Sequence, residues 1–215
     1  MTKKILMTRH GETQWNTIRR MQGHKNSPLT EFGVSQAHWL KERLENDPID
    51  VIYTSPLGRA YETAMILSQG RDIEVIKRDE LKEIYMGSWE GQQIEDVEQS
   101  HAEINYYFWN EPDKYIPIDG ESFEEIIERS RIFFQEILLK SEHKNILVVA
   151  HAIILKSFIA YTKGRTVKDF WEGPHLQPTS LTKADLVDGE LVYEFVGDIS
   201  HHKGKSSFNG WFTED

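Results

Sequence analysis

Four basic side chains come soon after short apolar stretches of the sequence. Arg9 and His10 follow residues 3–7, Arg59 follows 51–54, and His151 follows 145–150. Such stretches are typical of buried strands, and ligands of open α/β sheets bind where strands end. A histidine can act as a nucleophile, and the forked guanidinium of arginine matches the oxygens of a phosphoryl group. The working hypothesis is therefore that His10 attacks a phosphoryl group that Arg9 holds.

The same chemistry needs further positive charge and an acid. Phosphoryl transfer is catalysed mostly by positioning and by preorganised positive charge, which a second arginine and a second histidine would supply. The leaving alkoxide also needs a proton, and the glycine-punctuated stretch 81–91 offers Glu83 as its donor. Without further information this choice stays open, because Glu80 and Glu90 lie close by in the sequence.

The elements that must position these residues alternate between strands and helices. Strands are predicted at 3–7, 51–54, 73–76 and 145–150, followed by a hairpin of strands at about 179–185 and 190–197 joined by Asp188-Gly189. Helices are predicted over about 31–45 after a Thr30 cap, from a Ser55 cap to Ser68, from a Ser122–Glu125 capping box to near Ser141, and over 153–162. This alternation favours an α/β fold with helices on both faces of a mostly parallel, mixed sheet.

Residues 92–118 differ in character from the rest of the chain. They hold a group of aromatic residues at 106–109 and several acidic residues, but a single lysine, Lys114. We expect them to form a small helical cap that is inserted into one domain spanning residues 1–215. The aromatic group fits a core as well as it fits contact with a substrate.

Composition and charge exclude several classes of protein. The 215 residues include 25 Lys and Arg against 35 Asp and Glu, a net charge of −10, which disfavours binding to nucleic acid or to an anionic membrane. The chain has no cysteine, so disulfides, thiolate metal sites and cysteine nucleophiles are excluded. No apolar run has the length of a signal peptide or a membrane span, and a cytoplasmic protein is expected.

The order of the motifs resembles the histidine phosphatase (phosphoglycerate mutase-like) superfamily, in particular its broad-specificity phosphatase branch. Its Arg-His-Gly signature matches Thr8-Arg9-His10-Gly11-Glu12-Thr13. Further matching positions, in chain order, are Trp15-Asn16, Gln22-Gly23, Pro28-Leu29-Thr30, Gly33, Gln36-Ala37, Ser55-Pro56-Leu57-Gly58-Arg59-Ala60, Thr63-Ala64, Glu83, Gly87, Glu90-Gly91, Gly120-Glu121-Ser122 and Val148-Val149-Ala150-His151. An Arg-His-Gly alone is weak evidence, whereas this ordered set spans residues 4 to about 200 and is highly specific. The resemblance implies a three-layer α/β sandwich.

The resemblance also implies a role for each matching residue. His10 would become phosphohistidine, with Glu83 acting as acid toward the leaving group and then as base toward water. Arg9, Arg59 and His151 would complete the catalytic set by holding the phosphoryl oxygens. The residues implied to bind phosphate or substrate are Arg9, Asn16, Gln22, Gly23, Arg59, His151 and Ala152. No metal or cofactor is implied, because the arginines and the second histidine supply the charge. Many relatives have glycine where this chain has Ala152, a small residue whose N–H could still face phosphate.

Three functions stay open at this point: a phosphomonoester hydrolase, a cofactor-dependent phosphoglycerate mutase and a non-catalytic module that binds a phospho-ligand. Mutases of this superfamily hold a carboxylate and a second phosphate with basic residues, and they tend to have arginine directly after the catalytic glutamate. Here Ile84 follows Glu83 and the cap has one lysine, so charge complementarity favours the hydrolase. A binding module needs neither nucleophile nor acid. The expected partner is a small phosphomonoester, and the chain is expected to be a monomer or a homodimer.

The adjacent His201 and His202 resemble a metal-binding pair. Neighbouring histidines point in different directions on most backbones, so we interpret them as part of a polar tail that begins at Ser200. That tail also holds Phe208, Trp211 and Phe212, whose role the sequence leaves open.

Overall fold

The computed structural model describes residues 2–204, so the aromatic residues of the tail, Phe208, Trp211 and Phe212, lie outside the described residues. Its centre is a six-stranded sheet with the order β3-β2-β4-β1-β5-β6. The strands are β1 (Lys3–Arg9), β2 (Val51–Thr54), β3 (Glu74–Lys77), β4 (Asn145–Ala150), β5 (Leu181–Val187) and β6 (Glu190–Asp198). The first four are parallel, whereas β5 pairs antiparallel with both β1 and β6, which confirms the mixed sheet.

The two central strands, β1 and β4, end side by side. Their register pairs Arg9 with Ala150, so the residues that follow, His10 and His151, leave the sheet at the same edge. Both strands are almost continuously buried, as expected for apolar runs that are covered on both faces. The sheet therefore brings the two histidines of the sequence motifs to one place.

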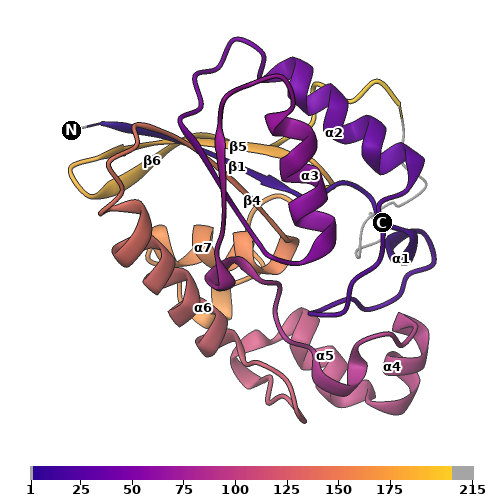
Figure 1. Cartoon of the computed structure of the whole chain (residues 1–215). Helices are drawn as coiled ribbons and strands as arrows, with labels where there is room; N and C mark the ends of the chain where they lie inside the picture. The colour runs from indigo at the N-terminus through magenta and orange to yellow at the C-terminus, as the bar shows by residue number, and fades with distance from the viewer. Residues whose placement is uncertain (1, 205–215) are drawn as a thin grey trace.

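Helices cover both faces of the sheet (Figure 1). One face packs α2 (Glu31–Arg43) and α3 (Gly58–Ser68) against side chains such as Leu6 and Leu147. The other face packs α6 (Phe123–Ile132), its continuation as a π-helix (Phe133–Leu138) and α7 (Ala152–Thr162) against Ile5, Met7 and Val148. Successive residues of β1 thus point to opposite layers, which is the period of two that a strand imposes. This is the expected three-layer α/β sandwich.

Most predicted boundaries agree with the structure to within a few residues. Thr30 caps α2, and Ser122 forms the predicted capping box with Glu125 at the start of α6. Asp188 and Gly189 both have positive φ, 51° and 90°, as a tight turn between β5 and β6 requires. A short helix, α1 (Gln14–Thr17), follows the Arg-His-Gly segment.

The predicted Ser55 cap is wrong. Helix α3 begins at Gly58, and its N-cap residue, Leu57, makes no side-chain capping bond. The Arg59 N–H in the first turn donates instead to Oδ1 of Asn26 at 3.0 Å. The Ser55 hydroxyl instead accepts a hydrogen bond from the Leu57 N–H and contacts the ring of His151 at 2.8 Å. The local Ser-Pro pattern is typical of a cap, but the Ser55 hydroxyl contacts His151, which directly follows β4.

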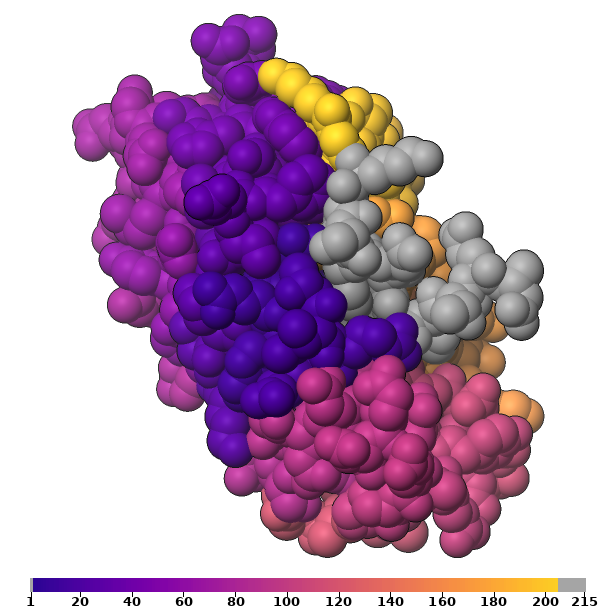
Figure 2. Space-filling view, turned by 90° about the vertical axis from the view of Figure 1, so that its right-hand side faces the viewer, coloured from indigo at the N-terminus to yellow at the C-terminus, as the bar shows by residue number. Residues whose placement is uncertain are grey.

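A second group of helices lies at one end of the molecule (Figure 1). It contains α4 (Ile94–Ser100), α5 (Ala102–Asn110) and a 3-10 turn (Pro112–Lys114). Phe108 of α5 is fully buried among aromatic rings, with Trp89, Tyr115 and Phe123 all within 6 Å of its centroid. Figure 2 shows this group packed against the N-terminal segment around α1, where the Met21 N–H donates to the Gln92 carbonyl.

Three further 3-10 turns complete the described elements: Asp79–Leu81, Gly87–Trp89 and Val167–Asp169. Among residues 2–204, no helix is long and apolar enough to cross a membrane.

Candidate active site

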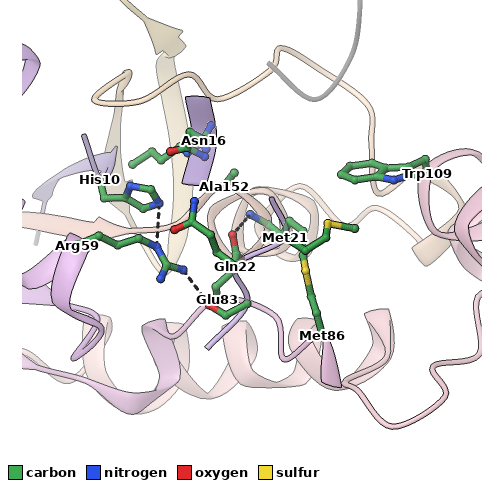
Figure 3. A pocket seen from close by; sticks show the side chains of 12 residues that line it. His10, Asn16, Met21, Gln22, Arg59, Glu83, Met86, Trp109 and Ala152 are labelled. Atoms are coloured by element: carbon green, nitrogen blue, oxygen red, sulfur yellow. Dashed lines mark hydrogen bonds between the residues drawn. The ribbon is translucent and has the colours of Figure 1, made fainter. Parts of the chain in front are cut away.

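A pocket opens where the parallel strands end. Its lining is Arg9, His10, Asn16, Met21, Gln22, Gly23, Arg59, Glu83, Met86, Trp109, Ala152 and Ile153, and it contains about 370 Å³ of space free of protein atoms, part of it open to solvent. Figure 3 shows His10, Arg59 and Asn16 on one side of this space and Met86 and Trp109 on the other. Eight of the nine predicted site residues line the pocket. The ninth, His151, is fully buried next to it, with its ring centroid 5.1 Å from that of His10.

The backbone fixes the end of β1. The His10 N–H donates to the Ala150 carbonyl at 3.0 Å, and the Thr179 N–H donates to the carbonyls of Arg9 and His10. The Arg9 side chain is 2% exposed, and its Nη1 donates to the Leu176 carbonyl at 2.9 Å. Arg9 and His10 therefore project into the pocket from a backbone that neighbouring segments hold on both sides.

The hydrogen bonds of His10 define its tautomer. Its Nδ1 lies 2.7 Å from the Gly11 carbonyl oxygen, an acceptor, so Nδ1 carries the proton and donates it. Nε2 then keeps a free electron pair, to which the Nε–H of Arg59 donates at 3.2 Å. A neutral imidazole with its electron pair on the pocket side is the form that a nucleophilic histidine needs.

The Arg59 guanidinium donates three hydrogen bonds, each to a different acceptor. Besides its bond to His10, its Nη1 donates to the Lys25 carbonyl at 2.9 Å and its Nη2 to the Gly23 carbonyl at 2.8 Å. Gly23 has a positive φ of 52°, a conformation that glycine adopts without strain. The loop after α1 therefore orients the guanidinium that helix α3 delivers.

His151 leaves one nitrogen without a partner. The Ser55 hydroxyl accepts from the Leu57 N–H and lies 2.8 Å from Nε2 of His151, to which it can donate its own proton. We assign this direction to the bond, which places the proton of His151 on Nδ1. Within residues 2–204 this Nδ1 has no hydrogen-bond partner, although it is buried. A buried donor without a partner is costly, so the site is built for an acceptor that enters from the pocket.

Glu83 lies at the N-terminus of α7. Its carboxylate accepts hydrogen bonds from the N–H groups of Ile84 at 3.0 Å, Ile154 at 3.1 Å and Ile153 at 3.3 Å. The first turn of a helix has free N–H groups and a partial positive charge, so it stabilises an anion there. Ala152 is the first residue of this helix and lines the pocket, as the resemblance implied.

Asn16 and Gln22 are joined through Thr13. The Asn16 Oδ1 accepts from the Thr13 hydroxyl at 2.9 Å, and the Gln22 Nε2 donates to that hydroxyl oxygen at 2.8 Å. These contacts use one end of each amide. The other ends, Asn16 Nδ2 and Gln22 Oε1, are buried without a partner in the described part of the chain.

Burial and positive neighbours set the charge states of the site. Burial, reinforced by Arg59, lowers the pKa of His10 and of His151 well below the usual value of 6.5, so both rings are neutral at pH 7. Burial also lowers the pKa of Arg9 and of Arg59 to about 10, which still leaves both guanidinium groups charged at pH 7. The site therefore combines two neutral imidazoles with two cations.

The far side of the pocket consists of residues that the sequence analysis did not assign to the site. Met21 follows α1, Met86 lies two residues after Ile84, and Trp109 lies on α5. The aromatic group at 106–109 thus divides: Phe108 belongs to the core, Tyr106 is exposed, and Trp109 reaches the pocket. Methionine carries no chemical signature in a sequence, and only the aromatic group gave a signal that could have indicated this wall.

The histidine pair at 201–202 does not form part of a metal cluster. In the described residues no group of three or more histidine, cysteine, aspartate or glutamate side chains is placed to hold a metal ion. His201 is buried rather than exposed, and the His202 ring contacts the Thr179 hydroxyl at 3.0 Å. The interpretation of residues 200–204 as a loose polar tail is therefore wrong for these two side chains, which pack against the loop before β5.

Comparison with known proteins identifies the class that this fold and pocket define. The chain belongs to the histidine phosphatase superfamily (branch 1), whose family model matches residues 5–199. It is 33% identical to phosphoserine phosphatase 1 of Hydrogenobacter thermophilus, over 78% of this chain and 80% of that protein. It is 34% identical to the probable phosphoglycerate mutase GpmB of Proteus mirabilis, over 92% and 94% of the two chains.

A solved structure shows the same fold at higher similarity. YhfR of Bacillus stearothermophilus aligns with a TM-score of 0.89 and 38% identity, over 92% of this chain and 98% of its own. These matches confirm the expected superfamily, its enzyme class and the phosphoglycerate mutase-like fold.

Proposed function

We propose that this protein is a phosphomonoester hydrolase that works through a phosphohistidine on Nε2 of His10. The observation that carries the proposal is the hydrogen bond from Nδ1 of His10 to the Gly11 carbonyl, because it leaves the electron pair of Nε2 on the pocket side. The Nε–H of Arg59 donates to that electron pair. An incoming phosphoryl group displaces this one hydrogen bond and takes both the nucleophile and the guanidinium as partners.

The remaining donors then act on the phosphoryl oxygens. Arg9 and Arg59 supply charge, and two nitrogens that have no partner within residues 2–204, Nδ1 of His151 and Nδ2 of Asn16, supply further hydrogen bonds. The first step requires Glu83 to hold a proton: Nε2 of His10 bonds to phosphorus as the bond to the leaving oxygen breaks, and that oxygen takes this proton, which leaves Glu83 as the carboxylate. In the second step Glu83 takes a proton from water, and the water oxygen displaces His10 to release inorganic phosphate.

We further infer that residues 92–118 act as a cap within a single histidine phosphatase domain and that this cap favours a leaving group without a carboxylate. Trp109, on this segment, lies opposite the phosphoryl end together with Met21 and Met86. Among the pocket-lining residues in the described part of the chain, the cationic side chains are Arg9 and Arg59, both at the phosphoryl end. A mutase would need basic groups at the far side as well, so charge complementarity favours hydrolysis of a small phosphomonoester over phosphoglycerate isomerisation.

The test combines trapping of the intermediate with a side-by-side assay. Wild-type protein mixed briefly with ³²P-labelled aryl phosphate and quenched in alkali should carry acid-labile label, and His10→Ala should carry none. In parallel, 3-phosphoglycerate with 2,3-bisphosphoglycerate should yield no 2-phosphoglycerate. Label on His10→Ala, or hydrolysis by that variant at the wild-type rate, would refute the mechanism. Isomer formation that outruns phosphate release would establish the mutase instead, and binding of phosphate with no turnover would establish a binding module.

A further inference from the structure

Glu90 is a buried carboxylate that does not line the pocket. Its side chain is 6% exposed, in a chain whose other acidic side chains are mostly exposed. Its Oε1 accepts from the His24 N–H at 2.7 Å and from the Met86 N–H at 3.3 Å, and its Oε2 accepts from the Lys25 N–H at 3.2 Å. Two of these three donors belong to the loop that follows α1.

The same loop holds Arg59 through its carbonyl oxygens. Gly23 and Lys25 accept the two terminal N–H groups of the Arg59 guanidinium, while Glu90 binds the N–H groups of His24 and Lys25 from the other side. The fit is close, because a Cβ placed on Gly23 would lie 2.1 Å from Oε1 of Glu90. Each peptide group of this loop thus faces Arg59 with its oxygen or Glu90 with its nitrogen.

We propose that Glu90 is a positioning residue for Arg59: by fixing residues 23–25 it aims the guanidinium at Nε2 of His10 and at the phosphoryl group that replaces this contact. This inference rests on the proposed function for its kinetic consequence. The Glu90 carboxylate binds two peptide N–H groups of residues 23–25, and two carbonyl oxygens of the same segment bind the Arg59 guanidinium. Because an arginine matches a phosphoryl group through a rigid fork, a small rotation of that fork weakens its interaction with the transition state.

The loop keeps other attachments when the Glu90 side chain is changed. The loop after α1 is also joined to the segment after Glu90 by two backbone hydrogen bonds, from the Gly91 N–H to the Met21 carbonyl at 2.9 Å and from the Met21 N–H to the Gln92 carbonyl at 3.0 Å. These bonds stay in place when the Glu90 side chain is changed. The loop should therefore remain attached, while the Arg59 guanidinium is held less firmly in one orientation.

The principal variant is Glu90→Gln. Its amide oxygen can keep the place of Oε1, but its NH₂ group then faces the Lys25 N–H, donor against donor. We expect kcat for an aryl phosphate to fall about tenfold, equivalent to about 1.4 kcal/mol, with KM changed less than about threefold. Glu95→Gln is the matched control. Glu95 lies on α4, is exposed and pairs with Arg19, so loss of its charge should leave kcat unchanged.

A double-mutant cycle with Arg59→Ala separates positioning from general damage. If Glu90 acts through Arg59, adding Glu90→Gln to Arg59→Ala should cost less than about twofold further, because the group it positions is gone. Full additivity of the two losses would overturn the proposal. Glu90→Asp, which keeps the charge on a shorter side chain, runs through the same cycle if thermal unfolding shows that Glu90→Gln does not fold.

Binding of inorganic phosphate, measured by calorimetry, keeps this test separate from the proposed function. Glu90→Gln should weaken phosphate binding several-fold in the wild-type background and hardly at all in Arg59→Ala. If the wild type binds phosphate but turns over no phosphomonoester, the proposed function fails while this comparison still decides the role of Glu90. Unchanged phosphate affinity together with unchanged kcat in Glu90→Gln would refute the inference.

Discussion

The two ends of the pocket are built on different principles. At the phosphoryl end, His10, Arg59 and His151 are each tied by hydrogen bonds to backbone or hydroxyl groups, and all three are less than 4% exposed. At the far end, Met21, Met86 and Trp109 offer thioethers and an indole without a charge. Fixed polar groups recognise one geometry, whereas methionine adapts to many shapes. We infer that the chemistry is strict and the choice of leaving group permissive.

Glu83 lies between the two ends and gives the largest expected effect, because it is the proposed acid and base. Glu83→Gln keeps an oxygen acceptor but cannot donate and then recover a proton, so kcat for an alkyl phosphate should fall on the order of a thousandfold. For 4-nitrophenyl phosphate, whose leaving group needs little protonation, the loss in the first step should be much smaller. Stopped-flow measurement of the first turnover checks this. Equal losses for both substrates would show that Glu83 is not the acid.

Ser55 tests the rigidity of the phosphoryl end without touching a group assigned to bind phosphate. Ser55→Ala removes the donor to Nε2 of His151, which frees that ring to change tautomer and lose the Nδ1 proton. We expect kcat/KM to fall about tenfold for every substrate, in the range of one lost hydrogen bond to a catalytic group. Ser68→Ala, at an exposed hydroxyl at the end of α3, is the control. A loss that depends on the leaving group would contradict the separation of the two ends.

Trp109 tests the opposite end. Trp109→Ala should change the preference between a naphthyl phosphate and a short alkyl phosphate by about fivefold to tenfold, because the indole supplies apolar contact area to the larger group only. The rate for the alkyl phosphate should stay within about twofold of the wild type. Steady-state kinetics on the two substrates provide the measurement, and an equal loss on both would indicate that Trp109 supports the phosphoryl end.

Acid should weaken the protein through its phosphoryl end. The folded protein keeps His10 and His151 neutral because their pKa values are lowered, whereas the unfolded chain binds protons at both below about pH 6.5. The free energy of unfolding should therefore fall as the pH drops from 6.5 to 5, on the order of 1 kcal/mol for each histidine. Urea unfolding of wild type and His10→Gln at several pH values checks this, and an unchanged pH dependence in the variant would contradict it. His38→Gln, at an exposed histidine, serves as control.

Met86 gives the smallest expected effect. Met86→Leu keeps the volume and the apolar character of the wall, so kcat/KM should stay within about twofold for aryl and alkyl phosphates alike. Met86→Lys, by contrast, should favour substrates that carry a carboxylate. If Met86→Leu lost as much activity as Ser55→Ala, the far wall would be as strict as the phosphoryl end, and the comparison would fail.

The sequence was sufficient for the phosphoryl end and insufficient for the far end, for a physical reason. His10 and His151 each follow an apolar strand directly, so strand prediction and the rule that ligands bind at strand ends place them together. The wall of Met21, Met86 and Trp109 comes from two loops and a helix, and its members meet only after the chain has folded. No local period or spacing relates these three positions, so nothing short of the fold could assemble them.

Ser55 shows the complementary limit. Its position before a proline is typical of a helix cap, and a local pattern cannot reveal that a ring more than ninety residues away competes for the hydroxyl. The role of Glu90 was hidden in the same way, because its partners are peptide N–H groups that every residue except proline carries. A contact with a backbone group does not depend on the type of the partner residue, so the sequence does not indicate it.

The pairing of β1 with β4 has a consequence for how the enzyme becomes active. Arg9 and Ala150 lie opposite each other although most of the chain separates them, so the two histidines meet only when a long loop has closed. Contacts between such distant segments are slow to form during folding. The site is therefore completed late in folding. A cell that synthesises the protein from its N-terminus gains phosphatase activity only after β4 and the segment at Leu176 and Thr179, which holds Arg9 and the His10 carbonyl, have left the ribosome.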